Sequence, residues 1–396
     1  MGHEAETDYQ FESMAHCEHR LKWNIWSRSL RRAGRASFEA NAGGWCAWSL
    51  NLRRTGAKDD MMRILLCSYT FAPNLGGIET VSKILADEFC RMGATVTVAT
   101  YAPGPPMQAP YEVLRRPPFG KLYELARKSD VAWQNNISLN MLPAIFAARK
   151  PLVVTHQTWI TRNDGRRGWQ DRLKRAVLPA VQNVAISKAI AASLPRKSVV
   201  IGNPFEPGEF KDRGNAFRTR DIVFVGRLVS AKGCDLALRS LAILKSDGLR
   251  PSFSIIGDGP EAGALKQLTA ELGLNDQVTF LGALREGRGQ EVARHKVMVV
   301  PSLWAEPFGV VALEGLAAGC AVIASSGGGL PDAVGPCGML FPNGDAQALA
   351  AAMKDLLTDA VLREKLLAER DRHLEQFRPE TVARRYLEVF ESTLRK

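Results

Sequence analysis

The sequence predicts an α/β protein built from two doubly wound domains in tandem. Short apolar runs typical of buried strands alternate with helical patterns over most of the chain. This alternation is interrupted over residues 199–221 by a Gly-, Pro- and charge-rich stretch typical of an interdomain linker. The length of 396 residues is too great for one ordinary core and suits two domains.

The first 60 residues do not share this pattern. They hold four of the eight tryptophans and Arg-rich runs such as RSLRRAGR, without strand periodicity. Because Met61 and Met62 are followed by the clear strand RILLCSY, we expect residues 1–60 to be an appendage or to follow a start codon assigned too early. The segment HCEH, residues 16–19, lacks a fourth ligand and a suitable loop, so no metal site is expected there.

Each predicted domain alternates strands with helices; the first helix of the first domain is expected near residues 78–92, and the second domain has helices in CDLALRSLAILKSDG and EAGALKQLTAELG. In the first domain, residues 61–205, the strand runs lie near residues 62–68, 94–100, 130–133, 151–155 and 183–186. In the second domain, residues 206–378, they lie within DIVFVGRL, SFSIIGDG, VTFLG, VMVVPS and AVIASS. From about residue 345 the chain is helical, in AQALAAAMKDLLTD, VLREKLLAERDRHLEQF and a last helix over 379–396. Sheets of this kind bind ligands outside the carboxyl ends of their strands, so the loops there carry the functional candidates.

Composition and charge limit the functional classes. The net charge of +11 favours an anionic partner, which leaves a nucleoside diphosphate, an anionic membrane surface or nucleic acid. No transmembrane helix is expected, because no run of 18 apolar residues is free of charges and turn signals, and no secretory signal is visible. The seven cysteines form no CxxC pair and suit reduced thiols in a cytoplasmic protein.

Three Gly-containing loops follow predicted strands. In VGRLVSAKGCD, Arg227 and Lys232 suit a diphosphate, although two solvated surface cations remain the alternative. In PNLGGIE, the pair Gly76–Gly77 allows close approach of a ligand ahead of a helix N-terminus, or forms a simple tight turn. The loop in IIGDGPEAG does not have the GxGxxG spacing and is interpreted as a tight turn.

The stretch EPFGVVALEGLAAG, residues 306–319, predicts a helix with Pro307 just before or inside its first turn. The amides after this proline would lie at an open N-terminus, which attracts negative charge. Glu306 and Glu314 could accept hydrogen bonds from the hydroxyl groups of one ligand, such as those of a ribose. The alternative is that both are solvated surface charges.

At this point the residues resemble a known family. The ordered motifs VGRLVSAKG, IIGDGP, VTFLGAL, VVPSLWAEPFG, LAAGCAVIAS and GGLPDAV are similar to those of the retaining nucleotide-sugar glycosyltransferases of glycosyltransferase family 4. The hallmark E-x7-E of that family would be Glu306 to Glu314, and the resemblance covers about residues 62–396. It implies a GT-B fold, in which two Rossmann-like domains face a central cleft.

The resemblance also implies a role for each matching residue. Arg227 and Lys232 would bind the donor diphosphate, Glu314 the ribose hydroxyls, and Glu306 the transferred sugar. The amides of Phe308, Gly309 and Val310 would lie beside that sugar, and His156 in VVTHQTW near it. Leu284 would contact the base through its backbone, and Gly76 and Gly77 would lie near the diphosphate and acceptor. Catalysis is expected from Glu306, His156, Arg227 and Lys232, and the helix over 379–396 would cross back onto the first domain.

The implied reaction moves a sugar from a UDP-, GDP- or ADP-sugar to an acceptor hydroxyl with retention, in the synthesis of cell-envelope polysaccharide, lipopolysaccharide or glycolipid. The cations and helix amides would stabilise the leaving diphosphate in a front-face route. Because there is no D-x-D triplet, we expect neither an obligatory metal nor a cofactor. A nucleotide-sugar epimerase and a basic nucleic-acid-binding protein are the alternatives; the second requires a continuous basic stripe, which single cations at strand ends do not form.

Residues 159–181 form a basic stretch in which Trp159 and Trp169 are interleaved with six cations and two acids. Such a stretch can lie on an anionic membrane surface, which would place the protein on the inner face of the cell membrane. A solvated helix face with a few buried aromatic residues is the alternative. The expected partners are a nucleotide-sugar donor, a glycan or lipid-linked acceptor and this membrane surface, with no nucleic acid.

Overall fold

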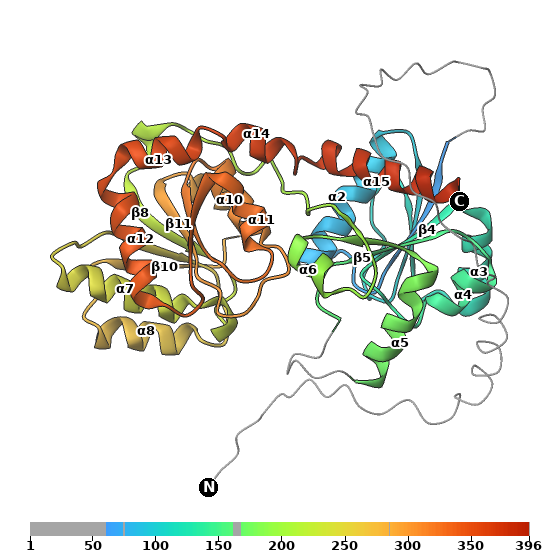
Figure 1. Ribbon diagram of the computed structural model, residues 1–396, viewed down its shortest axis with the longest axis horizontal. Coiled ribbons are helices and arrows are strands. Elements are labelled where there is room, and N and C mark those ends of the chain that lie inside the picture. The colour runs from blue at the N-terminus through green and yellow to red at the C-terminus, as the bar shows by residue number, and fades with distance from the viewer. Residues whose placement is uncertain (1–60, 74–75, 161–167, 285, 396) are drawn as a thin grey trace, which may run out of the picture. The chain divides into compact units, whose positions relative to one another are not determined.

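The computed structural model describes residues 61–73, 76–160, 168–284 and 286–395, and Met61–Lys396 form one compact unit. The predictions for residues 1–60, including the one for HCEH, lie outside the described residues. Within the described part, two separate parallel sheets account for all the strands (Figure 1).

The first sheet has seven parallel strands in the order β3-β2-β1-β4-β5-β6-β7. The chain runs outward from β1 to β3 and then returns to the other side of β1 at β4, so the strand order reverses between β1 and β4. Five consecutive residues of β1 are buried, as expected for a parallel strand covered on both faces. The strands are β1 (Arg63–Ser68), β2 (Thr95–Thr100), β3 (Glu112–Arg115), β4 (Val131–Asn135), β5 (Leu152–His156), β6 (Gln182–Ala185) and β7 (Val199–Val200).

Helices with one apolar face cover this sheet. In α2, Val81, Leu85 and Phe89 recur every four residues and are all buried in the core of the first domain. The helices before the second sheet are α2 (Gly77–Arg91), α3 (Phe119–Lys128), α4 (Leu142–Ala147), α5 (Trp169–Val177) and α6 (Lys188–Ser193).

The second sheet has six parallel strands in the order β10-β9-β8-β11-β12-β13, and its order reverses between β8 and β11. Alternate residues of its strands enter two different cores: Val223 packs on one side, and Ile222 and Phe224 on the other. The strands are β8 (Arg220–Val225), β9 (Phe253–Ile256), β10 (Val278–Gly282), β11 (His295–Val300), β12 (Ala321–Ser325) and β13 (Gly338–Phe341). The helices are α7 (Cys234–Ser246), α8 (Ala262–Glu271), α9 (Arg288–Val292), α10 (Val310–Ala317), α11 (Leu330–Val334), α12 (Ala346–Thr358), α13 (Ala360–Leu367), α14 (Arg370–Glu375) and α15 (Pro379–Leu394).

The structure corrects several local predictions. The stretch 199–221 is not wholly irregular, because Val199 and Val200 pair with β6 as β7. The helix predicted from VLREKLLAERDRHLEQF is two helices, α13 and α14. The short strands β3 and β13 were not found in the sequence. With four residues each, they are too short to show a clear period.

The last helix, α15, packs against α2 and β5 of the first sheet (Figure 1). Its Tyr386 and Phe390 are fully buried beside Trp133 of β4, with ring centroids 5.2 Å and 6.0 Å from the Trp133 ring. The Tyr386 hydroxyl also bonds the hydroxyl of Thr155 at 3.1 Å. The end of the chain therefore contributes to the core of the first domain.

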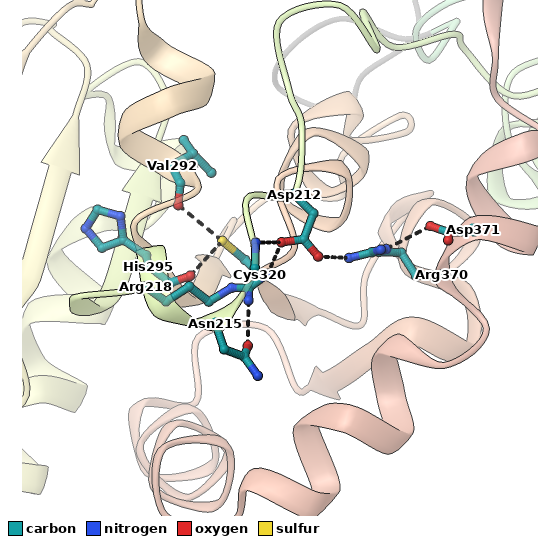
Figure 2. A network of polar contacts seen from close by, with 9 residues as sticks. Asp212, Asn215, Arg218, Val292, His295, Cys320, Arg370 and Asp371 are labelled. Atoms are coloured by element: carbon teal, nitrogen blue, oxygen red, sulfur yellow. Dashed lines mark hydrogen bonds and ion pairs between the residues drawn. The ribbon is translucent and has the colours of Figure 1, made fainter.

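A network of polar contacts lies where the chain enters the second sheet, just before β8 (Figure 2). Asp212 accepts hydrogen bonds from Arg218 at 2.5 Å and from Arg370 of α14 at 2.6 Å. Beside it, the Cys320 thiol donates to the backbone carbonyls of Val292 and His295. These contacts join the segment before β8, the start of β12 and α14, and so stabilise the amino-terminal edge of the sheet.

Candidate active site

The loops after β8 and β11 meet where the order of the second sheet reverses, which is the usual ligand position in such sheets. Gly233 follows the loop after β8 and has a φ of 67°. A Cβ there would come within 2.0 Å of the Pro301 carbonyl oxygen, so only glycine fits. The amide of Leu303 donates to the Ala231 carbonyl at 3.0 Å, which fixes the two loops together.

This contact brings Lys232 and Glu306 together. The Lys232 ammonium donates to Glu306 Oε1 at 2.5 Å, and the Ser302 hydroxyl donates to the same oxygen at 2.7 Å. Glu306 is buried, whereas the Lys232 side chain is 31% exposed. The predicted diphosphate cation and the predicted sugar-binding carboxylate are therefore direct neighbours.

A Gly-rich loop holds the backbone of Glu306. The Gly329 amide donates to the Glu306 carbonyl at 2.7 Å. Gly328 has a φ of 71°, and a Cβ there would lie 2.2 Å from the same carbonyl oxygen. Asn343 supports the other side, since its amide nitrogen donates to the Ser302 carbonyl at 3.0 Å. Both residues of the buried Ser302–Glu306 hydrogen bond are thus anchored from outside their own loop.

The helix predicted within residues 306–319 begins at Val310, not near Pro307. Gly309 has a φ of 101°, and this left-handed residue separates the non-helical segment 306–308 from α10. The Phe308 side chain is buried against Phe377, with ring centroids 5.5 Å apart. The Phe308 side chain therefore belongs to the core, and the contact of the backbone amides of Phe308, Gly309 and Val310 with a ligand stays a prediction.

Glu314 lies in a separate ionic cluster. Arg288 of α9 donates to Glu314 Oε1 at 3.3 Å and to Glu209 Oε2 at 3.2 Å, and it lies over the Phe210 ring at 5.0 Å. Burial raises the pKa of Glu314 to about 7, and the Arg288 charge opposes that rise. Its carboxyl group is therefore poised to change charge near neutral pH.

The remaining second-domain candidates lie nearer the surface. Arg227 is exposed, and its guanidinium makes no hydrogen bond or ion pair with the described residues. Leu284 is half-buried and packs against the core that contains α10. The nearby glycines of IIGDGP serve the fold, because a Cβ at Gly257 would lie 1.8 Å from the Gly226 carbonyl oxygen.

The first-domain candidates lie on two different elements, strand β5 and the start of helix α2. His156 ends β5 and is fully buried, with Nε2 bonded to Asn183 Oδ1 at 3.0 Å. Burial is the main cause that lowers the His156 pKa, and its Nδ1 has no partner among the described residues. Gly76 and Gly77 begin α2, and a Cβ added at Gly77 would meet nothing within 4 Å. Packing therefore does not explain the glycine at position 77.

Comparison with known proteins now decides the fold. Residues 208–372 match the family model of glycosyl transferases group 1. HepE from Anabaena, in complex with UDP, has a TM-score of 0.72 and 21% identity over 84% of this chain and 100% of its own. The sucrose-phosphate synthase of Thermosynechococcus elongatus has a TM-score of 0.67 and 21% identity over 84% of this chain and 98% of its own. The chain has the GT-B fold. The fold class predicted from the sequence is confirmed.

Among curated sequences, the D-inositol 3-phosphate glycosyltransferase of Rhodococcus erythropolis is 35% identical over 179 residues. This match covers 43% of the present chain and 40% of the relative. The chain thus spans about two fifths of the length of the curated relatives it matches. The matched family segment contains all the second-domain candidates of this GT-B protein.

Three site residues were missed by sequence reasoning: Ser302, Arg288 and Asn343. Ser302 lies four residues before Glu306, within VVPSLWAEPFG, so its place in a motif could have indicated it. Arg288 and Asn343 lie in no quoted motif, and only the folded GT-B structure brings them to Glu314 and Ser302.

First-domain side chains also contact the carbonyls on either side of Glu306. The Trp159 indole donates to the Ala305 carbonyl at 2.9 Å, and the Ser187 hydroxyl donates to the Pro307 carbonyl at 2.7 Å. Trp159 is therefore a packing and hydrogen-bonding residue of the site, in line with the alternative of a buried aromatic residue, and the membrane contact of residues 159–181 stays a prediction. Trp169 begins α5 and is 67% exposed.

Half of the six cations predicted for a membrane surface can be placed, because Arg172, Lys174 and Arg175 lie on α5. Residues 161–167, which hold the other three, lie outside the described residues. Across the described ranges, no helix is long and apolar enough to cross a membrane.

Proposed function

We propose that this protein is a retaining glycosyltransferase that moves a sugar from a nucleoside-diphosphate sugar to an acceptor hydroxyl. The observation that carries the proposal is the Lys232–Glu306 pair at the point where the second sheet reverses its order. Lys232 would supply a cation for the leaving diphosphate, and the neighbouring Glu306 would supply a carboxylate that can accept hydrogen bonds from sugar hydroxyls.

The comparisons support a nucleotide-sugar donor. Solved structures of HepE contain UDP and UDP-glucose, and the curated relatives are named as D-inositol 3-phosphate glycosyltransferases. The shared segment, residues 208–372, contains Arg227, Lys232, Glu306 and Glu314. We therefore assign the donor to the second domain, with Leu284 beside the base and Glu314 on the ribose.

In the proposed reaction the bond between the anomeric carbon and the diphosphate oxygen breaks. The acceptor oxygen forms the new bond to the same carbon, and its proton passes to the leaving diphosphate. Negative charge develops on that diphosphate, where Arg227, Lys232 and the amides of residues 308–310 would stabilise it. Arg227 is suited to this task because no described residue neutralises it.

The anomeric configuration can be retained in two ways. Either two displacements follow each other, or the acceptor attacks the anomeric carbon on the same face from which the diphosphate leaves. The first route needs a carboxylate nucleophile. Oε1 of Glu306 already accepts from Lys232 and Ser302, which disperses its negative charge and weakens it as a nucleophile. These contacts favour the front-face route, with Glu306 orienting the sugar.

The first domain is proposed to receive the acceptor, a glycan or lipid-linked hydroxyl of the cell envelope. The open space at Gly77 would allow a ligand to approach the N-terminus of α2. His156 is closed off from solvent, so we assign it a positioning role through the β5 end rather than a direct contact with the reacting atoms. Peripheral attachment to the inner face of the membrane is proposed to use the exposed Trp169 and its basic neighbours.

The test is a thermal-shift screen of the full chain against UDP-, GDP- and ADP-sugars, because a ligand that binds the folded state raises its melting temperature. The donor that is found is then incubated with and without acceptor, and the anomeric configuration of the product is read by NMR. We expect transfer with retention and a loss of turnover of at least about a hundredfold in Lys232→Ala, with little change in Lys354→Ala, an exposed lysine on α12.

An inverted product would exclude retention. Conversion of the donor sugar without any acceptor would support an epimerase instead. Full turnover in Lys232→Ala, or no stabilisation by any nucleotide sugar, would overturn the proposed site.

A further inference from the structure

Helices α3 and α4 pack against each other (Figure 1). A shallow hollow of about 550 Å³ lies at their ends. It is lined by Tyr123, Arg127, Ala147, Ala148, Arg149 and Lys150. Tyr123 and Arg127 lie on α3, and the other four are the last residue of α4 and the three that follow it, just before β4 and β5 begin. The hollow is therefore at the amino-terminal edge of the first sheet, opposite the strand ends that carry His156.

The hollow has an excess of positive charge. Its lining includes three cations and, among the described residues, no acid. The side chains of Arg127, Arg149 and Lys150 make no hydrogen bond or ion pair with another described residue. In contrast, Lys128 on the same helix pairs with Glu124 at 2.6 Å. Asp130, which senses the Lys150 charge, is itself bonded by Arg63 at 2.7 Å.

The partial negative charges at the C-termini of α3 and α4 do not balance all three cations. A helix C-terminus behaves as roughly half a negative charge, so the ends of α3 and α4 together supply about one. Their last carbonyls are also partly satisfied, since the Ser129 amide donates to Leu125 and the Arg149 amide donates to Phe146. An excess of about two positive charges remains without a partner.

The backbone of Arg149 is a second, independent observation. Arg149 has a φ of 54° and follows Ala148, the C-cap of α4. Glycine is the residue usually found at this left-handed position, because a side chain is disfavoured there. The helix end requires this backbone conformation but not an arginine, so the backbone by itself does not explain the residue at this position.

We propose that this hollow is an anion site that takes a phosphoryl group, held by Arg127, Arg149 and Lys150. Arginine forks and a lysine ammonium together match the oxygens of a phosphate mono- or diester. Phe119 and Tyr123 precede Arg127 at intervals of four on α3, so they share its face, and Phe119 is 57% exposed. The phosphoryl group can belong to a lipid headgroup, with Phe119 entering the lipid, or to a soluble phosphate.

The test uses the full chain and Arg149→Gly. This substitution removes one cation and places the favoured residue at the left-handed position, so the melting temperature should stay the same or rise. Binding of pyrophosphate is measured by calorimetry in Lys232→Ala, which weakens the proposed donor site. Binding to phosphatidylcholine vesicles is measured with and without phosphatidylglycerol.

We expect Arg149→Gly to weaken binding of the phosphoryl probe by about tenfold, and Lys354→Ala to leave it unchanged. Loss of vesicle binding alone identifies a lipid headgroup as the source, and loss of pyrophosphate binding identifies a soluble phosphate. If neither probe binds the hollow, or if Arg149→Gly binds both as the parent chain does, the proposal is wrong. Neither result bears on the glycosyl transfer, because the hollow lies at the other edge of the sheet.

Discussion

The ammonium of Lys232 lies 2.5 Å from Oε1 of Glu306, although 74 positions separate the two residues in the chain. Each residue lies in a loop at the carboxyl end of a strand, and the two strands, β8 and β11, are direct neighbours. The proposed diphosphate cation and sugar carboxylate therefore position each other, and substitution of either one disturbs both.

This relationship predicts coupling between the two residues. Lys232→Met and Glu306→Gln should each lower the free energy of unfolding by about 1–2 kcal/mol, since a partly buried charged hydrogen bond is lost. The double variant should lose less than the sum, by about 1 kcal/mol, because the second change removes no further bond. Urea unfolding of the four chains measures this term, and additive effects would show that the pair does not form in solution.

Glu314 predicts a pH dependence of donor binding. Its pKa is raised to about 7, mainly by burial, so the carboxylate that would accept ribose hydroxyls is lost as the pH falls through 7. Donor affinity measured by calorimetry should fall over that range. The Glu314→Gln variant should bind the donor with the same affinity at every pH in that range. If its affinity fell with pH as that of the parent chain does, the assignment would be contradicted.

The same group predicts an opposite trend in stability. Because its pKa is raised from 4.5 to about 7 on folding, the folded state binds more protons than the unfolded state between these values. Stability contributed by Glu314 is therefore present below about pH 4.5 and lost as the pH rises to about 7, by roughly 3 kcal/mol at most. Glu314→Gln should remove this loss from the pH dependence of urea unfolding.

Asp212 predicts a loss of stability in acid. Burial alone would raise its pKa, but hydrogen bonds from Arg370 and Gly214, together with the Arg218 charge, lower it below 3.8 (Figure 2). Its contribution is present above 3.8 and lost as the pH falls through the lowered value. Asp212→Asn should cost about 2 kcal/mol at neutral pH, because the Arg218 side chain is only 8% exposed and would lose its carboxylate.

In the Asp212→Asn variant the additional loss below about pH 4 should disappear. Asp371→Asn is the matched control, since that carboxylate is 87% exposed and contacts Arg370 from the solvent side. Equal effects of the two substitutions on urea unfolding would contradict the importance of the buried network.

Phe390 predicts that the last helix stabilises the first domain. The side chain is fully buried, and its ring centroid lies 5.6 Å from that of Phe89 and 6.0 Å from that of Trp133. Phe390→Ala should cost about 3–5 kcal/mol, because it leaves a cavity among aromatic rings. Leu394→Ala, at an exposed position of the same helix, should cost less than about 0.5 kcal/mol. Similar melting temperatures for the two variants would show that α15 is not docked.

The alternation of apolar runs and helical patterns determined the fold class, because strand and helix periods are local properties of the chain. It also located most strands, such as 62–68 for β1 (Arg63–Ser68). It did not find β13, since a strand of four residues shows little of the two-residue alternation. It also missed the true start of α10, because Gly309 lies against Leu330, a contact that no local pattern reveals. Sequence patterns at strand ends nominated Lys232, Glu306 and Glu314, whose roles stay predictions.

Only the tertiary structure decided which candidates meet. Strand order cannot be derived from a local period, and it is the pairing of β8 with β11 that brings Lys232 to Glu306. The same holds for Arg288, which lies in no motif yet contacts Glu314, and for the unpaired cations beside Arg149, whose left-handed backbone is visible only in three dimensions. Local propensity thus determined the elements of this protein, and long-range hydrogen bonding and burial determined its sites.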